Sequence, residues 1–218
     1  MQTADLRTHF FPAFYRGIGW ELGKGNPVFQ QRLKERNIDP ESPEAGQFWI
    51  DNVWHGSAWS WEKLPWLIKT WKELSGGKPF ALKGIQSVAD AKRAVEIEGM
   101  DGLVVSNHAG RQVDGAIASL DALDQISRAV GHKTTLMFDS GVRSAADIFK
   151  ALALGAKVVF VGRLWIFGMG IAGEAGVRHV MKSLLAEFDI LMNCTGHTSI
   201  ADITRDSLQH LPYGSRME

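Results

Sequence analysis

The sequence contains little cysteine, no excess of charge and no long apolar run, and each absence excludes a class of protein. The single cysteine, Cys194, excludes an internal disulfide framework and a metal site built from several cysteines. The 24 Lys and Arg residues balance the 24 Asp and Glu residues, so the net charge gives no indication of binding to nucleic acid or to an anionic membrane. No apolar run approaches the roughly 18 residues that a membrane-spanning helix requires. We therefore expect a globular, cytoplasmic protein that binds neither nucleic acid nor membrane.

The chain changes character near Gly76-Gly77, which divides it into residues 1–76 and residues 77–218. In the first region, six of the eight tryptophans lie between residues 49 and 71, and glycine and proline interrupt the sequence. Short helices are predicted for residues 27–36 and 64–74, with Ser60 as a candidate cap of the second. We interpret the first region as a long loop with an adjoining barrel helix. Its tryptophans either pack within the loop or form a lid over a ligand.

After Gly77, short apolar strands alternate with amphipathic helices. The strands are predicted at residues 80–83, 102–105, 135–138 and 158–161, and the helices at 87–98, 119–130, 144–154 and 173–191. Continuous apolar strands are typical of a parallel sheet that is buried on both faces. Polar or glycine-rich motifs follow the strands directly. Ligands bind at such strand ends in (β/α)8 barrels and in open doubly wound sheets, so this placement leaves both folds open.

Two of these strand ends combine glycine with arginine. The motif Asp139-Ser140-Gly141-Val142-Arg143 follows the third strand, and Gly162-Arg163 follows the fourth. Glycine lets backbone N–H groups approach a ligand, helix N-termini attract anions, and the arginine fork fits phosphate. Barrels commonly hold phosphate at their last two strand ends. The alternative is a pair of tight turns with surface arginines, but two such turns on successive units favour a phosphate site.

The segment after the second strand carries the candidate catalytic residues. His108 can take a proton near neutral pH, and Arg111 can hold a carboxylate through two parallel hydrogen bonds. The pair suits a substrate whose carboxylate adjoins an oxidisable carbon bearing a hydroxyl group. Such an oxidation requires a cofactor, and Lys83 could place its ammonium group beside it. Taken singly, His108 and Lys83 are more often structural or surface residues, and only their shared placement favours a catalytic role.

Together these motifs resemble the FMN-dependent 2-hydroxy acid dehydrogenase/oxidase family, to which glycolate oxidase belongs. The resemblance is carried by Leu82-Lys83-Gly84-Ile85, by residues 106–114 and 139–143, by residues 150–156 and by Val161-Gly162-Arg163, in the family's order. Residues 112–123 and 176–180, and the long segment before residue 60, are most similar to the lactate 2-monooxygenase branch.

The resemblance implies the C-terminal half, strands 5 to 8, of a (β/α)8 TIM barrel. It further implies that the protein binds FMN and oxidises a small L-2-hydroxy acid such as lactate. His108 would be the active-site base beside the substrate, Arg111 would bind the substrate carboxylate, and Lys83 and Ser106 would contact the flavin ring system. The residues implied for the ribityl and phosphate groups are Asp139, Ser140, Gly141, Val142, Arg143, Gly162 and Arg163.

The sequence departs from the family at one residue of the motif and in its extent. Ala109 stands where glycine is usual; a left-handed backbone there would cost about 1 kcal/mol, whereas a negative φ would let the methyl group narrow the pocket. Only four of the eight units are recognisable. Neither Tyr15 nor Tyr213 matches the family's substrate-binding tyrosine, and a family arginine expected just before Ala4-Asp5 is missing.

Half a barrel would expose two sheet edges, which favours a homo-oligomer or pairing with a complementary half-barrel. A truncated product, an incomplete gene sequence and a half-barrel completed by a partner are the alternatives. The alternative function is an inactive half-barrel that binds phosphate or FMN weakly or associates with other chains. A phosphate-binding barrel isomerase is a weaker interpretation, against which the spacing of His108 and Arg111 argues.

Overall fold

The computed structural model describes residues 23–53 and 59–209, and these residues form two compact units that meet in sequence between Ser60 and Trp61. Composition predicted a boundary near Gly76-Gly77 instead. The boundary falls earlier because helix α5 (Leu64–Ser75) packs with the second unit, in which Lys72 on α5 forms an ion pair with Asp101. Trp54, Tyr15, Tyr213 and the Ala4-Asp5 pair lie outside the described residues.

The first unit is a pair of short helices, α3 (Pro27–Glu35) and α4 (Pro43–Val53). Helix α3 confirms the predicted helix, and Asn26 caps it by accepting the N–H of Phe29 at 3.0 Å. The prediction of a loop was wrong for α4, which begins with proline, a residue suited to the first helical position. The ring of Trp49 lies edge-on to Phe29, with 4.9 Å between ring centroids, so this tryptophan packs in the core of its own unit.

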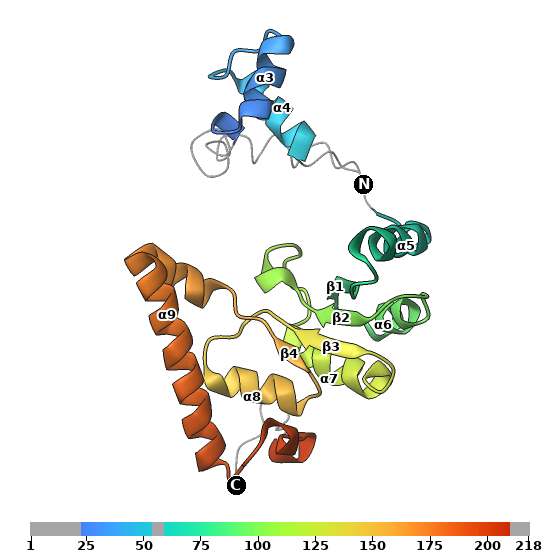
Figure 1. Ribbon diagram of the computed structural model, residues 1–218, viewed down its shortest axis with the longest axis vertical. Coiled ribbons are helices and arrows are strands. Elements are labelled where there is room, and N and C mark those ends of the chain that lie inside the picture. Colours follow the sequence, from blue (N-terminus) through green and yellow to red (C-terminus); the bar gives the residue numbers. More distant parts are fainter. Residues whose placement is uncertain (1–22, 54–58, 210–218) are drawn as a thin grey trace. The chain divides into compact units, whose positions relative to one another are not determined.

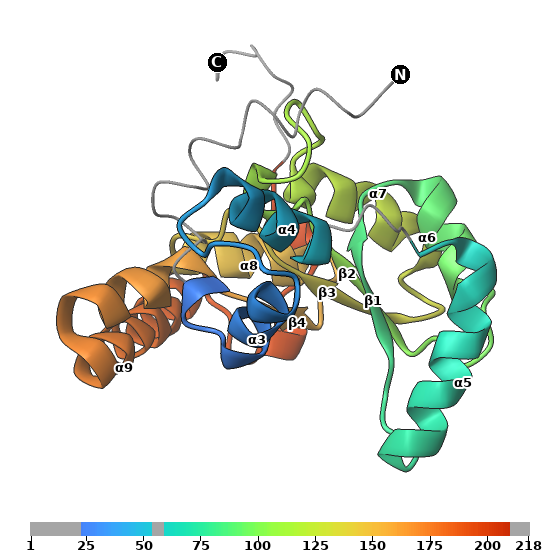
Figure 2. The ribbon, with the colours of Figure 1, turned by 90° about the horizontal axis from the view of Figure 1, so that it is seen from above.

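The second unit contains a parallel sheet in the order β1-β2-β3-β4 (Figures 1 and 2). Its strands are β1 (Ala81–Ile85), β2 (Gly102–Val105), β3 (Thr135–Phe138) and β4 (Val158–Val159). Strands β2 and β3 have the predicted bounds. Strand β1 continues past Lys83 through an irregularity in its pairing with β2, so Lys83 lies in the middle of the strand and not at its predicted end. Only two residues of the predicted fourth strand pair with β3.

One face of the sheet is covered by α6 (Val88–Val95), α7 (Ser119–Val130) and α8 (Ala145–Ala153). Side chains of these helices pack with Leu103 and Val105 from β2 and with Leu136 and Phe138 from β3. Successive strand residues point to opposite faces, so Val104 and Met137 lie on the other face. Helix α6 ends earlier than predicted, whereas α7 has the predicted bounds.

Helix α9 (Arg163–Cys194) begins ten positions before the predicted helix and runs alongside α8 (Figure 1). It has a break at Ala172 and Gly173, and Gly173 has a φ of 55°. The helix was predicted only from this break onward, because Gly168 and Gly170 weaken the helical pattern before it. The other short turns are 3-10 helices, η1 (Trp61–Lys63), η2 (His108–Gly110), η3 (Ile200–Asp202) and η4 (Arg205–Ser207). Because η1 precedes α5, Lys63 rather than Ser60 occupies its N-cap position.

The two outer strands of the sheet are more exposed than the apolar sequence predicted. Every residue of β2 is buried, whereas β1 and β4 have exposed positions. Val158 on β4 and the following Phe160 are 41% and 45% exposed. Burial on both faces was therefore correct for β2 and wrong for β1 and β4, because each outer strand has a neighbour on one side only.

Neither a membrane span nor a metal-binding cluster is found among residues 23–53 and 59–209. No helix there combines the length and apolar character needed to cross a bilayer. No group of three or more His, Cys, Asp or Glu side chains there is arranged to hold a metal ion.

Candidate functional site

Three polar side chains meet where the first three strands end, and we refer to Lys83, Ser106 and Asp139 as the strand-end cluster. The sheet places them: the backbone N–H of Ser106 bonds to Ile85, and that of Asp139 bonds to Val105. The Lys83 ammonium group lies 3.0 Å from Ser106 Oγ and 3.2 Å from Asp139 Oδ2. Ser106 Oγ in turn donates a hydrogen bond to Asp139 Oδ1. The three side chains that were predicted on separate strand ends therefore form one bonded group.

Ser106 is the centre of this cluster and is only 1% exposed. Besides its bond to Asp139, its hydroxyl oxygen accepts the ammonium group of Lys83 and, at 3.1 Å, the backbone N–H of His108. A serine hydroxyl offers one hydrogen and two lone pairs, so the bonding capacity of Ser106 is filled. The cluster is thereby joined directly to the residue predicted to be the base.

The environment of Asp139 favours its charged form. Burial alone would raise its pKa, but hydrogen bonds from Ser106, Ser140 and Lys83, together with the positive charge of Lys83, outweigh that effect and lower the pKa below 3.8. Near neutral pH the carboxylate is therefore ionised and pairs with the lysine. This pairing fixes a positive charge at the end of β1.

The segment that carries His108 and Arg111 is a short turn with a left-handed backbone. His108, Ala109 and Gly110 have φ angles of 55°, 58° and 72°. The first of the two alternatives considered for Ala109 therefore applies, since its methyl group occupies a conformation that favours glycine. The side chains of His108 and Arg111 are exposed, and neither makes a hydrogen bond or ion pair within the part of the chain that the structure describes.

Asn107 and Ser119 hold this turn, although the sequence interpretation gave them no role. Asn107 Oδ1 accepts the N–H of Gly110 at 3.1 Å, and its amide group donates to the carbonyl of Ile117. Ser119, at the start of α7, accepts the N–H of Asn107 at 2.8 Å. An asparagine that begins a turn commonly bonds to the backbone in this way, so the position of Asn107 was a usable signal. No feature of the sequence indicated the bond between Asn107 and Ser119.

The two glycine–arginine turns differ at the helices that follow them. At the start of α8, Asp147 accepts the N–H groups of Arg143 and Ser144 at 2.9 and 3.1 Å, so its own carboxylate caps that helix. At the start of α9, Gly162 is the N-cap residue and no side chain caps the helix. The N-terminus that is available to an anion is therefore that of α9.

The residues at these turns suit a phosphate-bearing cofactor. A Cβ atom added at Gly141 or Gly162 would meet nothing within 4 Å, so the backbone there faces open space. The exposed Arg143 and Arg163 lie beside these two glycines. Arg163 also donates to the carbonyl of Ala109 at 2.9 Å, which joins the second turn to the His108 segment. Val142 differs, because it is only 7% exposed and packs in the core.

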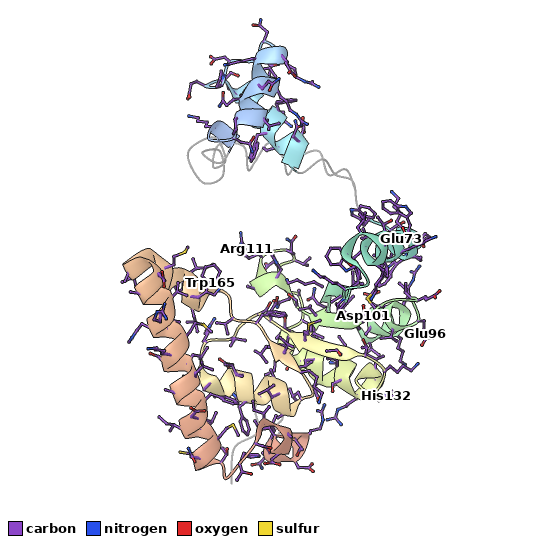
Figure 3. All side chains as sticks on the ribbon, viewed as in Figure 1. Glu73, Glu96, Asp101, Arg111, His132 and Trp165 are labelled. Atoms are coloured by element: carbon purple, nitrogen blue, oxygen red, sulfur yellow. The ribbon has the colours of Figure 1, made fainter. Side chains whose placement is uncertain are left out.

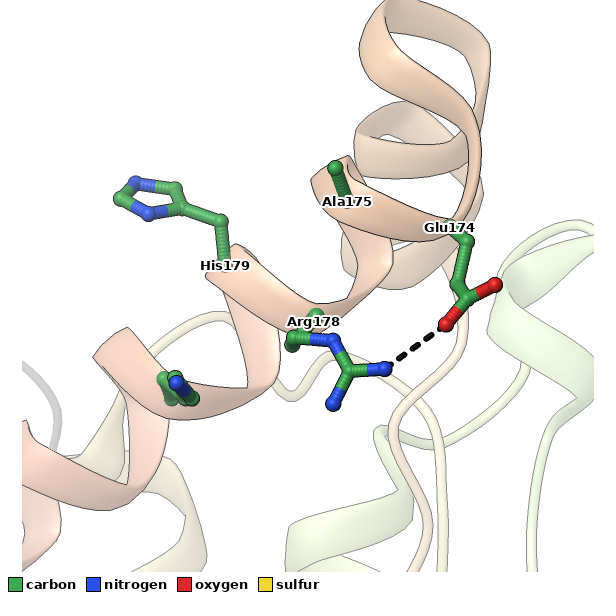
Figure 4. A pocket seen from close by; sticks show the side chains of 5 residues that line it. Glu174, Ala175, Arg178 and His179 are labelled. Atoms are coloured by element: carbon green, nitrogen blue, oxygen red, sulfur yellow. Dashed lines mark hydrogen bonds and ion pairs between the residues drawn. The ribbon is translucent and has the colours of Figure 1, made fainter.

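Figure 3 places Arg111 at the end of the sheet where the strands finish, whereas Asp101 and His132 lie where β2 and β3 begin. The hollow in Figure 4, of about 460 Å³, lies elsewhere: its lining residues, Glu174, Ala175, Arg178, His179 and Lys182, all belong to α9. One of its walls is an ion pair between Glu174 and Arg178 at 2.7 Å. None of the predicted site residues lines this hollow.

The chain is similar in sequence to a described family and to curated relatives. Residues 14–210 match the pattern of the family described as FMN-dependent dehydrogenase. The FMN-dependent alpha-hydroxy acid dehydrogenase qulF of Penicillium citrinum is 45% identical over 211 residues, which cover 96% of this chain and 50% of the relative. The L-lactate dehydrogenase of Pectobacterium atrosepticum is 44% identical over 190 residues, 87% of this chain and 47% of the relative. The chain thus spans about half the length of these curated relatives.

Solved structures agree with the sequence relatives. An oxidised active mutant of (S)-mandelate dehydrogenase matches with a TM-score of 0.63 and 39% identity, over 69% of this chain and 40% of that chain. A mandelate oxidase mutant with a monooxide FMN adduct matches with a TM-score of 0.62 and 38% identity, over 68% and 46% of the two chains. Because the family pattern covers nearly the whole sequence and the fold agrees with that of these enzymes, the chain belongs to the FMN-dependent 2-hydroxy acid dehydrogenase family, whose cofactor is FMN.

Proposed function

We propose that the protein oxidises a small L-2-hydroxy acid of the lactate class, with FMN as the electron acceptor. The observation that carries the proposal is the bond between the strand-end cluster and the backbone of His108. Through it a candidate base is held beside a fixed lysine charge, and Arg111 follows within the same turn. Relatives named L-lactate dehydrogenase support this substrate class.

We infer cofactor contacts at both strand-end turns, and the resemblance and the geometry support this inference. We assign the phosphate to Gly162 and Arg163 with the uncapped start of α9, and the ribityl chain to residues 139–143. Lys83 would contact the flavin ring system, and Ser106 contributes by holding the lysine ammonium group in place. FMN, when bound, accepts the two electrons that leave the substrate carbon.

The remaining steps belong to side chains of this chain. Arg111 binds the substrate carboxylate through paired hydrogen bonds and so fixes the carbon that bears the hydroxyl group. Oxidation of the hydroxyl group to a carbonyl group releases two electrons and two protons. A ring nitrogen of His108 takes one of these protons, and the other would leave with the two electrons to FMN when it is bound. The Lys83 ammonium group offers a positive charge where negative charge accumulates during reduction.

Anaerobic reduction of the purified protein tests this proposal. We expect a yellow protein whose flavin absorbance disappears on addition of L-lactate. His108→Ala should retain FMN but lose reduction by about 100-fold or more, because the base is absent while the cofactor contacts remain. Protein that stays colourless with added FMN contradicts the proposal, and loss of FMN in His108→Ala shows that His108 has another role.

The lactate 2-monooxygenase branch is a finer proposal, supported by the resemblance of residues 112–123 and 176–180. It predicts that aerobic turnover of lactate gives acetate and carbon dioxide. A dehydrogenase or oxidase gives pyruvate instead, so analysis of the carbon product decides between them. The assignment of residues 1–76 to a lid region and the cytoplasmic location rest on the sequence alone and stay predictions.

A second candidate function is supported by the exposed sheet edges. We infer that β1 to β4 are strands 5 to 8 of a TIM barrel and that their outer edges pair with another copy or with a complementary half-barrel. The exposure of Val158 and Phe160 supports this association. An inactive half-barrel would associate and bind phosphate or FMN only weakly. Light scattering of the purified chain tests association, because a monomer at all concentrations contradicts self-pairing, and FMN titration measures the cofactor affinity.

A further inference from the structure

The turn that carries His108 holds an uncommon backbone conformation. Three successive residues, His108, Ala109 and Gly110, have left-handed φ angles. Single left-handed residues are common, but runs that include side-chain-bearing residues are disfavoured, because the Cβ atom approaches the following carbonyl oxygen. Such a conformation persists only where surrounding contacts impose it. The contacts that do so here therefore control where the imidazole lies.

Each of the three N–H groups in this turn donates to a side-chain oxygen. His108 donates to Ser106 Oγ at 3.1 Å, Ala109 to Ser140 Oγ at 2.9 Å, and Gly110 to Asn107 Oδ1 at 3.1 Å. Ser106 and Asn107 directly precede the turn. Ser140 instead follows β3 and lies 31 positions further along the chain. Of these three acceptors, Ser140 is thus the one that ties the turn to another strand.

Ser140 itself occupies a position that favours glycine. Its φ is 83°, in the left-handed region that L side chains rarely adopt. Its hydroxyl group donates to Asp139 Oδ1 at 2.7 Å, which directs a lone pair of the oxygen toward the N–H of Ala109. A serine under backbone strain therefore uses its hydroxyl group to connect the turn to the carboxylate of the strand-end cluster.

We infer that Ser140 is a positioning residue that holds the Ala109 peptide, and with it His108 and Arg111, in the orientation needed for proton transfer and carboxylate binding. The inference rests on the proposed function. It assigns the hydroxyl group of Ser140 to the turn, so that only the backbone of Ser140 remains for the ribityl contact proposed for residues 139–143. Because the peptide of Ala109 lies between the two candidate side chains, its rotation would displace both of them.

Two substitutions of Ser140 distinguish the effect of losing the hydroxyl group from the effect of the backbone strain. Ser140→Gly relieves the strain and Ser140→Ala retains it, and both remove the oxygen. In the full chain, we expect the amide of Ala109 to exchange its hydrogen about tenfold faster in both variants, while amides of β3 keep their rates. Ser75→Ala is the matched control, since its hydroxyl oxygen accepts the N–H of Lys78 at 3.1 Å away from the turn. Unchanged exchange at Ala109 overturns the inference.

Kinetics and FMN binding test the consequence of this contact. Both variants should lower kcat for the 2-hydroxy acid about 10- to 100-fold and raise its KM, because a displaced base and carboxylate clamp lose alignment. The Kd for FMN should change by less than about threefold. Ala109→Gly should reduce the kinetic effect of Ser140→Gly, because glycine adopts the left-handed conformation without the serine bond. A raised Kd for FMN with unchanged Ala109 exchange makes Ser140 a cofactor contact and overturns the inference.

The outcomes distinguish this inference from the function on which it rests. If the unsubstituted chain neither binds FMN nor oxidises a 2-hydroxy acid, the proposed function fails and the inference fails with it. If the unsubstituted chain is active but the two Ser140 variants match it in kcat and KM, only the inference fails. Faster Ala109 exchange together with the kinetic losses supports both.

Discussion

Removal of the Asp139 carboxylate tests whether the strand-end cluster stabilises the fold. Asp139→Ala deletes the acceptor of hydrogen bonds from Ser106 and Ser140 and leaves the buried Ser106 hydroxyl group without an acceptor. Hydrogen bonds to charged groups contribute about 1.5–3 kcal/mol each, whereas an ion pair with a lysine as exposed as Lys83, at 48%, contributes about 1 kcal/mol or less. Since such terms are not additive, we expect a loss of about 2–4 kcal/mol in the free energy of unfolding.

Asp139→Asn should lose less, about 1–2 kcal/mol, because the amide oxygen still accepts a hydrogen bond while the charge is gone. Urea unfolding followed by circular dichroism measures both losses. Asp114→Ala is the matched control, since Asp114 is exposed and makes no hydrogen bond or ion pair with the residues that the structure describes. If the free energy of unfolding of Asp139→Ala lies within about 0.5 kcal/mol of that of the unsubstituted protein, the bonds of this cluster do not stabilise the fold. That result would refute the prediction.

The same substitution changes the dependence of stability on pH. The pKa of Asp139 in the folded protein lies below the ordinary value of 3.8. Its contribution is therefore complete above that value and is lost as the pH falls through the folded pKa. Asp101 and Asp202 also have lowered pKa values, mainly through hydrogen bonds from Lys72 and Ser199, so part of the acid loss persists in Asp139→Asn. If the free energy of unfolding of Asp139→Asn falls with decreasing pH as steeply as that of the unsubstituted protein, Asp139 does not contribute to the loss of stability in acid.

Two further substitutions test the turns around the cluster. Ala109→Gly should stabilise the fold by about 1 kcal/mol, or roughly 2–4 °C in Tm, because glycine adopts the φ of 58° without strain. Asn37→Gly, at a φ of 55°, is its control and should change Tm less, since asparagine tolerates this conformation; a lower Tm for Ala109→Gly contradicts the prediction. Arg163→Gln should raise the Kd for FMN at least about tenfold if Arg163 binds the phosphate, as equilibrium titration can measure. An unchanged Kd would show that Arg163 serves only to hold the carbonyl of Ala109.

The elements that were predicted correctly carry their signals in local sequence. Strands β2 and β3 are apolar runs bounded by polar residues, and α7 has a complete amphipathic pattern. Ser87 begins the helix predicted at residues 87–98, and it caps α6 with a hydroxyl oxygen that accepts the N–H of Asp90 at 3.1 Å. A cap of this kind depends on residues three positions apart, so the sequence alone is sufficient to identify it.

The elements that were predicted incorrectly depend on contacts distant in sequence. The four apolar residues at 158–161 were predicted as one strand, but only Val158 and Val159 pair with β3, and a single sequence does not show where a partner strand ends. The first part of α9 contains two glycines that disfavour a helix, Gly168 and Gly170, yet Gly168 packs closely against Gly176 across the break. A larger side chain at either position would clash there. The tertiary contact therefore favours glycine, which is the residue that weakens the helical pattern in the sequence.

The sequence predicted that the site residues lie at the same edge of the sheet, but it did not predict the hydrogen bonds between their side chains. Parallel strands bring their ends to one edge of a sheet, which was enough to place Lys83, Ser106 and Asp139 together. The bonds that join them connect residues 23 and 33 positions apart, and no local pattern specifies which hydroxyl meets which carboxylate. The sequence left the φ of Ala109 undecided for the same reason, because the N–H of Ala109 donates to Ser140, which follows a different strand.

The described site contains two kinds of polar group with different consequences for substitution. The cluster has its partners within the unit, since each side-chain bond of Ser106 and Asp139 is made to a residue of β1 or of the segments that follow β2 and β3. The side chains of His108 and Arg111 have no such partners among the described residues, while their backbone is held by the cluster and its neighbours. Functional groups that face a ligand require a support whose own bonds are satisfied. Substitutions in the cluster should therefore alter stability and geometry together, whereas His108→Ala and Arg111→Ala should alter the chemistry and leave the free energy of unfolding nearly unchanged.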